Sequence, residues 1–485
     1  MKKPGIYLSI TPIILLIAMI ILGVKVFGED LTSGPSQISL IITSAVVIFI
    51  SILYLKIPWS QIEEGINQQL HNTGGAIYIL LMIGALTSTW MLSGIVPSLI
   101  YYGLKLIHPS IFLAASFLLS VVVSVLSGSS WTTCGTIGVA LISAGTLLGI
   151  HPGWLAGAII SGAYFGDKRS PLSDSCNLSA SMSGVDLYRH IGYLMYTNMP
   201  AFIISLAVFL IAGFVIDINQ VDVSAILHNV TGSFNISPWY LLIPCFTIFL
   251  IYKKVPAFIT LLISALMGAV LAFFAQPHIV SQIYGEVTGS FNQFLYASLK
   301  MLSTSVEVNA GNEMMTELAC TDGMSGMMNT ILLILCVIIF GGSIQASGMI
   351  MTITEKMIKF MNSTFSIVAS TVGTGIFCNI ALSDQYMAII LPSKMFGETY
   401  RKQGYAPELL SRSVEDSSTV TSVLVPWNTC AVAQSTVLGV ATLTYLPYCI
   451  FNILSPIMSI FVAAIGWKIR RIPVETETET ETITK

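Results

Sequence analysis

Uninterrupted apolar runs long enough to cross a lipid bilayer recur along most of this chain. A membrane-spanning helix needs about 20 mainly apolar residues, and stretches of this kind follow one another from residue 6 to residue 468. Charged residues make up only 9% of the 485 positions, whereas soluble domains usually carry about a quarter. We therefore expect an all-α polytopic membrane protein whose main partner is the lipid bilayer.

The hydropathy pattern predicts helices near residues 6–27, 37–55, 76–106, 110–126, 133–166, 191–215, 238–252, 255–275, 327–346, 349–382, 385–400, 407–425, 428–446 and 448–468. Several stretches are too long or too interrupted for one span, so we expect about 11 to 14 membrane elements. Cytoplasmic loops of membrane proteins are enriched in Lys and Arg. This rule places both termini in the cytoplasm, through Lys2, Lys3, Lys468, Arg470 and Arg471, and places the loops with Glu29–Asp30 and Asp217–Asp222 outside.

Sequence landmarks recur at a nearly constant spacing. Ser93 recurs as Ser347, 254 positions later, and Pro152 recurs as Pro407, 255 positions later. The side assignment gives the two copies, 75–215 and 327–468, opposite orientations, as in many secondary transporters that bind substrate at broken helices or re-entrant hairpins. The other parts would be N-terminal helices (1–74), connecting helices with an external amphipathic segment (216–326) and a disordered Thr-Glu tail (469–485).

Polar segments interrupt these apolar runs, and an ionisable residue within a span is a candidate for function because its insertion costs about 2.5 to 3.5 kcal/mol. The first, residues 127–136, is rich in Gly and hydroxyls. Ser127, Ser130 and Thr133 offer the oxygen donors that a dehydrated Na⁺ requires, and Gly permits an unwound backbone. The alternative is that these small residues only allow close helix packing.

The second segment, residues 166–177, places Asp167, Lys168, Arg169 and Asp174 around a proline that cannot continue a helix. Here Asp167 and Asp174 are candidate ion or proton carboxylates, with Ser173 and Asn177 as neutral donors. In the second copy, the matching segment at 425–430 contributes Asn428 and Thr429. The alternative interpretation is an ordinary cytoplasmic loop.

Two further segments lie in the second copy. Residues 379–385 hold Asn379 and Asp384, although Asp384 could serve only as a helix N-cap. Residues 412–419 hold the adjacent Glu415 and Asp416. Adjacent side chains point about 100° apart on a helix, so one carboxylate is expected to face the site while the other pairs with Arg412; a helix-start acidic cluster is the alternative.

A carboxylate within the membrane can couple Na⁺ to H⁺ because burial favours its protonated form and a bound cation favours its ionised form. Other functions lack support in this sequence. The cationic residues form no stripe for a nucleic acid, the six His and eight Cys have no transition-metal spacing, and no hydrolase motif is present. We expect a carrier with no cofactor, neither an enzyme nor a passive channel.

The string at residues 162–178, GAYFGDKRSPLSDSCNL, resembles the signature of the NhaC family of Na⁺/H⁺ antiporters, as do residues 186–190 and 195–197. Family members commonly have two Thr before Asn177, where this chain has Ser175 and Cys176. The resemblance implies a bacterial inner-membrane transporter that exchanges Na⁺ for H⁺ by alternating access. It also leaves open a homodimer and an organic-anion exchanger of the malate/lactate type, in which Lys168 and Arg169 would attract a small carboxylate.

Overall fold

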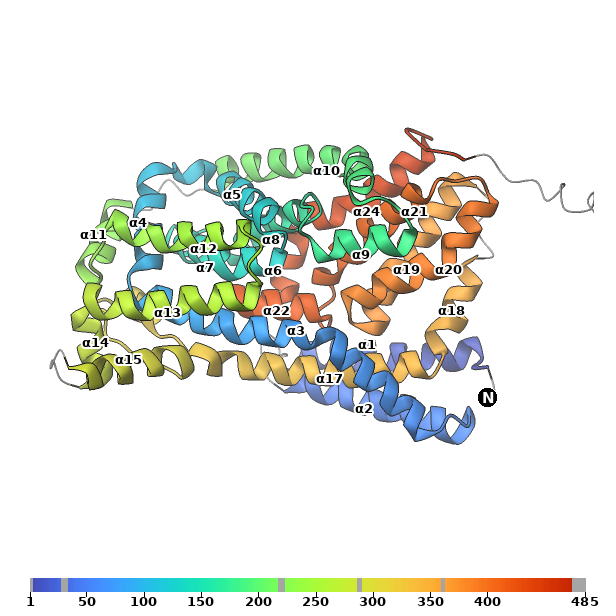
Figure 1. Ribbon diagram of the computed structural model, residues 1–485, viewed down its shortest axis with the longest axis horizontal. Helices are drawn as coiled ribbons and strands as arrows, with labels where there is room; N and C mark the ends of the chain where they lie inside the picture. The colour runs from blue at the N-terminus through green and yellow to red at the C-terminus, as the bar shows by residue number, and fades with distance from the viewer. Residues whose placement is uncertain (1–2, 28–33, 217–222, 286–289, 359–362, 473–485) are drawn as a thin grey trace, which may run out of the picture.

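The structure is a computed structural model that describes residues 3–27, 34–216, 223–285, 290–358 and 363–472 (Figure 1). Across these ranges the chain is helical, with two isolated β-bridges, Val306 to Thr321 and Tyr405 to Arg471. The all-α prediction is confirmed. The expected external loops at Glu29–Asp30 and Asp217–Asp222, and residues 473–485 of the expected disordered tail, lie outside the described residues.

The helices of the first half are α1 (Ile6–Phe27), α2 (Pro35–Phe49), α3 (Trp59–Leu92), α4 (Ile95–Leu106), α5 (Phe112–Ser127), α6 (Ser130–Thr133), α7 (Val139–Leu147), α8 (Pro152–Asp167), α9 (Asp174–Ser183), α10 (Leu187–Val215), α11 (Val223–Ser233) and α12 (Leu242–Tyr252). Those of the second half are α13 (Ala257–Ala275), α14 (Pro277–Tyr284), α15 (Phe291–Ser303), α16 (Glu313–Ala319), α17 (Met328–Ala346), α18 (Met349–Ile358), α19 (Thr364–Leu382), α20 (Gln385–Lys402), α21 (Pro407–Val414), α22 (Thr429–Leu438), α23 (Thr442–Tyr445) and α24 (Ile450–Ala464). Short π-helical turns are η2 (Ile50–Tyr54), η4 (Cys134–Gly138) and η7 (Glu415–Thr419), and 3-10 turns are η3 (Pro109–Ile111), η5 (Pro238–Leu241), η6 (Gly323–Met327), η8 (Ser422–Leu424) and η9 (Leu446–Tyr448).

Eight helices of the described ranges are long and apolar enough to cross a membrane, or ten if each of two bent pairs counts as one span. One bent pair is α22 with α23 and η9, which turns by 88°. The expected 11 to 14 elements also counted shorter pieces such as α4, α8 and α24, which fall below this length. The prediction of a polytopic membrane protein with broken helices is confirmed.

The breaks in the two predicted copies share one backbone geometry. Helix α5 ends at Gly128 in the left-handed conformation (φ +66°), and Ser129 then caps α6 with its side chain. Helix α19 ends at Ser383, also left-handed (φ +58°), and Asp384 then caps α20. A left-handed residue stops a helix and a capping side chain starts the next. The corresponding residues are again 255 positions apart, whereas the opposite membrane orientation of the copies stays a prediction.

The second break of each copy follows the same scheme. Helices α8 and α21 begin with Pro152 and Pro407, a position where the missing N–H of proline is harmless. The helices that follow these breaks, α9 and α22, are capped by the side chains of Ser173 and Asn428. Each copy therefore contains two helix starts that are capped by the side chain of the preceding residue.

Close packing of small residues fixes the helix that carries Asp167. A Cβ atom added at Gly162 of α8 would lie 2.3 Å from the carbonyl oxygen of Phe117 on α5, and one at Gly166 would lie 2.6 Å from the carbonyl oxygen of Val121. The hydroxyl of Ser124 also donates to the carbonyl of Ala163 at 2.5 Å. Small residues four apart let membrane helices approach closely, so α8 presses against α5 and its last residue is held in place.

Helix α3 runs along the molecule beside α13 and α17 (Figure 1). The proposed boundary between residues 74 and 75 falls inside this helix, and the division into domains stays a prediction. The segment expected to be amphipathic contains α14, α15 and α16; α14 and α15 lie at one end of the molecule, and the start and the finish of the described chain lie at the other.

Candidate ion-binding site

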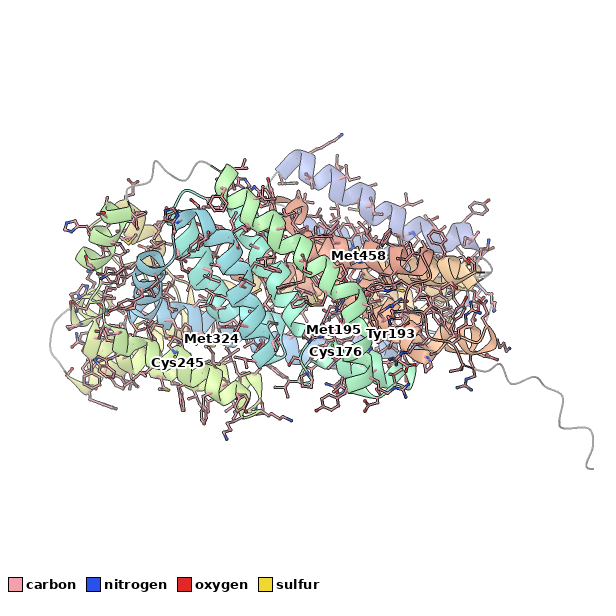
Figure 2. The ribbon with its side chains drawn as sticks, turned by 90° about the horizontal axis from the view of Figure 1, so that it is seen from above. Cys176, Tyr193, Met195, Cys245, Met324 and Met458 are labelled. Carbon is pink, nitrogen blue, oxygen red and sulfur yellow. The ribbon has the colours of Figure 1, made fainter. Side chains whose placement is uncertain are left out.

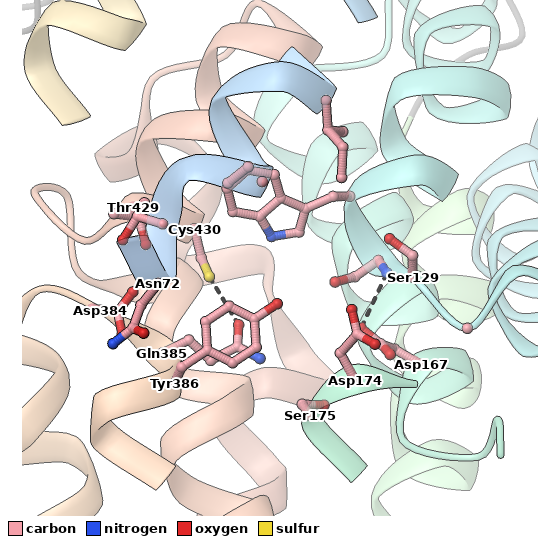
Figure 3. A pocket seen from close by; sticks show the side chains of 17 residues that line it. Asn72, Ser129, Asp167, Asp174, Ser175, Asp384, Gln385, Tyr386, Thr429 and Cys430 are labelled. Atoms are coloured by element: carbon pink, nitrogen blue, oxygen red, sulfur yellow. Dashed lines mark hydrogen bonds between the residues drawn. The ribbon is translucent and has the colours of Figure 1, made fainter. Parts of the chain in front are cut away.

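A cavity of about 200 Å³ lies where the helix breaks of the two copies face each other (Figure 3). The first copy contributes Asp167, Asp174, Ser175 and the break at Gly128, and the second contributes Asp384 and the start of α22. Helix α3 forms a further wall. The lining residues are Asn72, Thr73, Gly75, Ala76, Ile79, Gly128, Ser129, Ser130, Trp131, Asp167, Asp174, Ser175, Asp384, Gln385, Tyr386, Thr429 and Cys430.

Asp167 ties the two breaks of the first copy together. Its side chain, 6% exposed at the end of α8, accepts a hydrogen bond at Oδ2 from the backbone N–H of Ser130 at 3.1 Å. Its other oxygen, Oδ1, is buried without a hydrogen-bond partner. A buried carboxylate oxygen is costly to leave unpaired, so Oδ1 is available to a cation or a proton in the cavity.

Asp384 lies at the position of the second copy that corresponds to Ser129, 255 positions later. It is 1% exposed, and its Oδ1 accepts a hydrogen bond from the N–H of Met387 at 2.8 Å, which makes it the N-cap of α20. Asp384 is therefore a helix cap, and it also lines the cavity; its role in ion binding stays a prediction. Asp174, by contrast, is exposed and begins α9 at the cavity wall. Figure 3 shows Asp167 and Asp174 on one side of Tyr386 and Asp384 on the other.

The charged side chains that line the cavity all carry the same sign of charge. Three carboxylates line it, and its wall, as far as the structure describes it, contains no Lys, Arg or His. The neutral groups around them are hydroxyls, amides and two aromatic rings, Trp131 and Tyr386. Oxygen donors with excess negative charge in a space of low dielectric constant attract a hard cation.

Lys168 lies outside the cavity wall and is occupied by another carboxylate. Its ammonium donates to Oδ1 of Asp416 at 2.6 Å, and both side chains are completely buried. It also donates to Asn198 and Ser455, each at 3.0 Å. In this conformation Lys168 is therefore not free to attract an anion. Arg169 is half-buried, and its guanidinium contacts the sulfur of Met195.

Glu415 and Asp416 lie side by side on the π-helical turn η7, and neither lines the cavity. As expected for adjacent residues, they point to different partners: Asp416 to Lys168, and Glu415 to the hydroxyl of Ser175 at 3.0 Å. The expected pairing with Arg412 is not seen within the described ranges. Arg412 instead lies over the ring of Tyr193, 4.6 Å from its centre, and its nitrogens are buried without a hydrogen-bond partner.

Among the predicted neutral donors, Ser130 and Thr429 line the cavity, and the others do not. The amide of Asn428 donates to the carbonyl of Asn379 at 3.2 Å, so these two join the breaks of the second copy. Ser127 and Thr133 lie 3.2 Å apart and stabilise the first break, and Ser173 caps α9. Asn177 is exposed and donates to the carbonyl of Ser173 at 2.7 Å.

Several lining residues were not anticipated. Asn72 and Thr73 belong to the polar first half of α3, which precedes the apolar run, and Gly74 and Gly75 obscured the continuity of this helix. Ser129, Trp131, Ser175, Gln385, Tyr386 and Cys430 lie next to or within the predicted segments. Proximity to a predicted break was the signal that could have found this second group.

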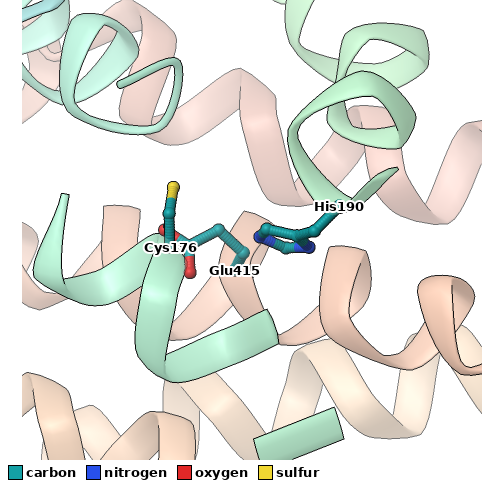
Figure 4. A group of neighbouring side chains, drawn as sticks. All are labelled: Cys176, His190 and Glu415. Atoms are coloured by element: carbon teal, nitrogen blue, oxygen red, sulfur yellow. The ribbon is translucent and has the colours of Figure 1, made fainter. Parts of the chain in front are cut away.

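A second polar cluster lies behind the cavity, where α9 packs against α10. Figure 2 shows Tyr193 and Met195 of α10 near Cys176 of α9. Cys176, His190 and Glu415 are all buried, and each offers a side-chain atom within 4.8 Å of the other two (Figure 4). The Cys176 thiol lies 3.3 Å from the carbonyl oxygen of Lys168 and donates to it. Because a protonated thiol is a poor metal ligand, this arrangement does not favour a transition metal.

A helical membrane protein whose broken helices surround an acidic interior cavity has the build of an ion-coupled secondary transporter. Comparison with known proteins identifies a family, because residues 162–467 match the Na⁺/H⁺ antiporter family. The chain is also 34% identical over 414 residues to the Na⁺/H⁺ antiporter NhaC of Alkalihalophilus pseudofirmus, covering 85% of this chain and 87% of that protein. The chain belongs to the Na⁺/H⁺ antiporter family, which confirms the resemblance drawn from its sequence.

Other relatives carry different substrates in their names. The malate-2H⁺/Na⁺-lactate antiporter of Bacillus subtilis is 34% identical over 417 residues, which cover 85% of this chain and 86% of that protein. The arginine/ornithine antiporter ArcD of Halobacterium salinarum is 30% identical over 472 residues, or 96% and 93% of the two chains. These relatives are antiporters, and they differ in what they exchange.

Proposed function

We propose that this protein exchanges Na⁺ for H⁺ across a bacterial inner membrane by alternating access, with both termini in the cytoplasm and the two copies inverted. The single observation that carries the proposal is the cavity wall, with carboxylates from both copies and no cationic side chain. Asp167, Asp174 and Asp384 would hold either Na⁺ or protons. Occupancy by one cation disfavours the other, so release of Na⁺ on one side follows proton uptake there.

The breaks suit this cycle because discontinuous helices allow a gate to move without unfolding a span. Ser130 and Thr429 are neutral donors in the cavity wall, one from each copy. When the gate of one copy opens, the carboxylates it carries would face water on that side. Protonation would then neutralise the cavity before it turns to the opposite side, which lowers the cost of carrying an empty acidic site through a medium of low dielectric constant.

Organic-anion exchange is the alternative, and the relative from Bacillus subtilis is the observation in its favour. A cationic side chain strengthens the binding of a carboxylate substrate. The nearest lysine along the lining segments, Lys168, is bound to Asp416. Lys168 would therefore bind an organic anion only in a conformation in which it has left Asp416.

Purified protein in liposomes tests these functions directly. An outward-directed Na⁺ gradient should acidify the lumen, as reported by an enclosed pH dye, when no organic substrate is present. Adding malate, lactate, arginine or ornithine should leave the initial rate unchanged. Proton movement that appears only with one of these substrates would replace simple Na⁺/H⁺ exchange with exchange of that substrate.

A further inference from the structure

Helix α3 brings two unpaired polar side chains to the break that precedes Asp384. The hydroxyl oxygen of Thr73 and the amide nitrogen of Gln69 are both buried without a hydrogen-bond partner among the described residues. These two residues are four positions apart, so they lie on one face of α3. Thr73 also lines the cavity. Most buried polar groups in folded proteins are paired, so this face of α3 requires an explanation.

Close packing through α17 holds this face of α3 against the break. One turn before Gln69, a Cβ atom added at Gly65 would lie 2.8 Å from the carbonyl oxygen of Gly342 on α17. A Cβ atom at Gly341 would lie 2.5 Å from the carbonyl oxygen of Leu382 and 3.9 Å from Cδ of Gln69. Small residues allow such close approach of membrane helices. The polar face of α3 and the end of α19 therefore flank the same residue of α17.

Two hydrogen bonds complete the arrangement around Asp384. The amide nitrogen of Asn72 donates to the sulfur of Met387 at 3.9 Å, and Met387 is the residue whose N–H Asp384 accepts. The backbone N–H of Thr429 donates to the carbonyl of Ser383 at 3.0 Å, which places the start of α22 on the same break. Figure 3 shows Asn72, Asp384 and Thr429 close to one another.

The hydroxyl of Thr73 does not take the bond that its helix offers. Hydroxyls in helices commonly donate to a carbonyl of the preceding turn, and Thr89 of α3 donates in this way to Ala85 at 2.9 Å. Thr73 forms no such bond in the part of the chain that the structure describes. Its oxygen therefore keeps both lone pairs for a ligand.

The groups that meet here have the chemistry of a cation site. Asp384 supplies a negative charge, and Thr73 and Thr429 supply hydroxyl oxygens at the cavity wall. Carboxylate and hydroxyl oxygens are the donors that hard cations prefer. A bound cation would also give the buried hydroxyl of Thr73 a partner, which offsets the cost of leaving it unpaired.

We propose that the hydroxyl of Thr73 is a ligand of the transported Na⁺, which it binds together with Asp384 and Thr429. The proposal rests on the proposed Na⁺/H⁺ exchange and deepens it, because it adds a ligand from α3, outside both predicted copies. Protonation of Asp384 needs no oxygen from α3. Thr73 therefore contributes to the affinity for Na⁺ and not to the affinity for protons.

Replacing Thr73 by Val distinguishes a ligand from a structural residue, because Val has a similar shape without the hydroxyl. In buffer with choline in place of Na⁺, loss of an unpaired buried hydroxyl should leave the melting temperature of the purified protein unchanged or raise it. Binding of ²²Na⁺ should weaken at least tenfold. Na⁺ should therefore raise the melting temperature of the wild type by more than that of the variant.

Three further variants complete the experiment. Thr73→Ser retains the hydroxyl and should bind ²²Na⁺ within threefold of wild type. Thr73→Ala lacks the hydroxyl and should show the same loss of binding as Thr73→Val. The control Thr87→Val removes a hydroxyl of the same helix that donates to the carbonyl of Gly84 at 3.0 Å, and it should bind ²²Na⁺ like the wild type.

The outcomes separate this proposal from the function on which it rests. Wild-type affinity for ²²Na⁺ in Thr73→Val or Thr73→Ala refutes Thr73 as a ligand. A melting temperature that falls by the same amount with and without Na⁺ also refutes it, because that result indicates a purely structural role. If the wild-type protein neither binds ²²Na⁺ nor is stabilised by Na⁺, the proposed Na⁺/H⁺ exchange itself is refuted, whatever the variants do.

Discussion

The buried ion pair of Lys168 and Asp416 should stabilise the native arrangement of the two copies. Replacing Lys168 by Met leaves Asp416 as a fully buried charge whose Oδ2 already has no partner. It also removes the donor to Asn198 and Ser455. Breaking a buried pair by removing one partner costs about 3 to 5 kcal/mol. The structure supports the upper part of this range because three acceptors lose the same ammonium.

Unfolding by SDS in mixed micelles, followed by tryptophan fluorescence, measures this loss as a free energy of unfolding. The double variant K168M/D416N removes the unpaired charge and should recover at least half of the loss. Lys402→Met is the control, because Lys402 pairs with Glu398 on the exposed face of α20, where ion pairs contribute little. A K168M protein within about 1 kcal/mol of wild type, or no recovery in the double variant, would refute the reasoning about burial.

Other substitutions test packing and the site separately. Gly162→Ala places a Cβ 2.3 Å from the carbonyl oxygen of Phe117 and should destabilise the protein by about 1 to 3 kcal/mol in the same assay. The control Gly192→Ala has open space around the added Cβ and should be neutral or stabilising. Equal effects of the two substitutions would contradict the close packing of α5 and α8. Asp384→Asn should retain the helix cap but lower the affinity for Na⁺. Asp384→Ala should lower the affinity as well and also reduce the free energy of unfolding by about 1 kcal/mol, because the cap is lost. Unchanged ²²Na⁺ binding in both variants would remove Asp384 from the site. Asp174→Asn should reduce ²²Na⁺ binding at least tenfold with unchanged unfolding, and wild-type exchange in that variant would exclude its role.

The sequence was sufficient to predict the helices and the places where they break, because both depend on local chemistry. Long apolar runs define spans, and Gly, Ser, Asp and Pro define caps and interruptions. The break at Gly128 and its counterpart before Asp384 were both expected, and both are present. The polar first half of α3 was not expected to be helical, because a hydropathy criterion responds only to its apolar half.

The partners of the charged residues could not be predicted in the same way. Lys168 and Asp416 are 248 positions apart and meet only because the fold packs both α8 and η7 against α24. Arg412 is near Glu415 in sequence, yet its guanidinium stacks on Tyr193 of α10. Local spacing correctly separated the directions of Glu415 and Asp416. It could not show that both would face other helices, since the packing of α9, α10 and α24 decides that.

The central claim is that Na⁺ and H⁺ compete for the same carboxylates. The most direct test measures equilibrium binding of ²²Na⁺ to the purified protein at a series of pH values. If one proton displaces each Na⁺, the apparent Kd should rise about tenfold for each unit by which the pH falls through the range where the carboxylates become protonated. The triple variant with Asn at positions 167, 174 and 384 should not bind Na⁺ at any pH. A Kd that does not depend on pH, or retained binding in the triple variant, would contradict the claim.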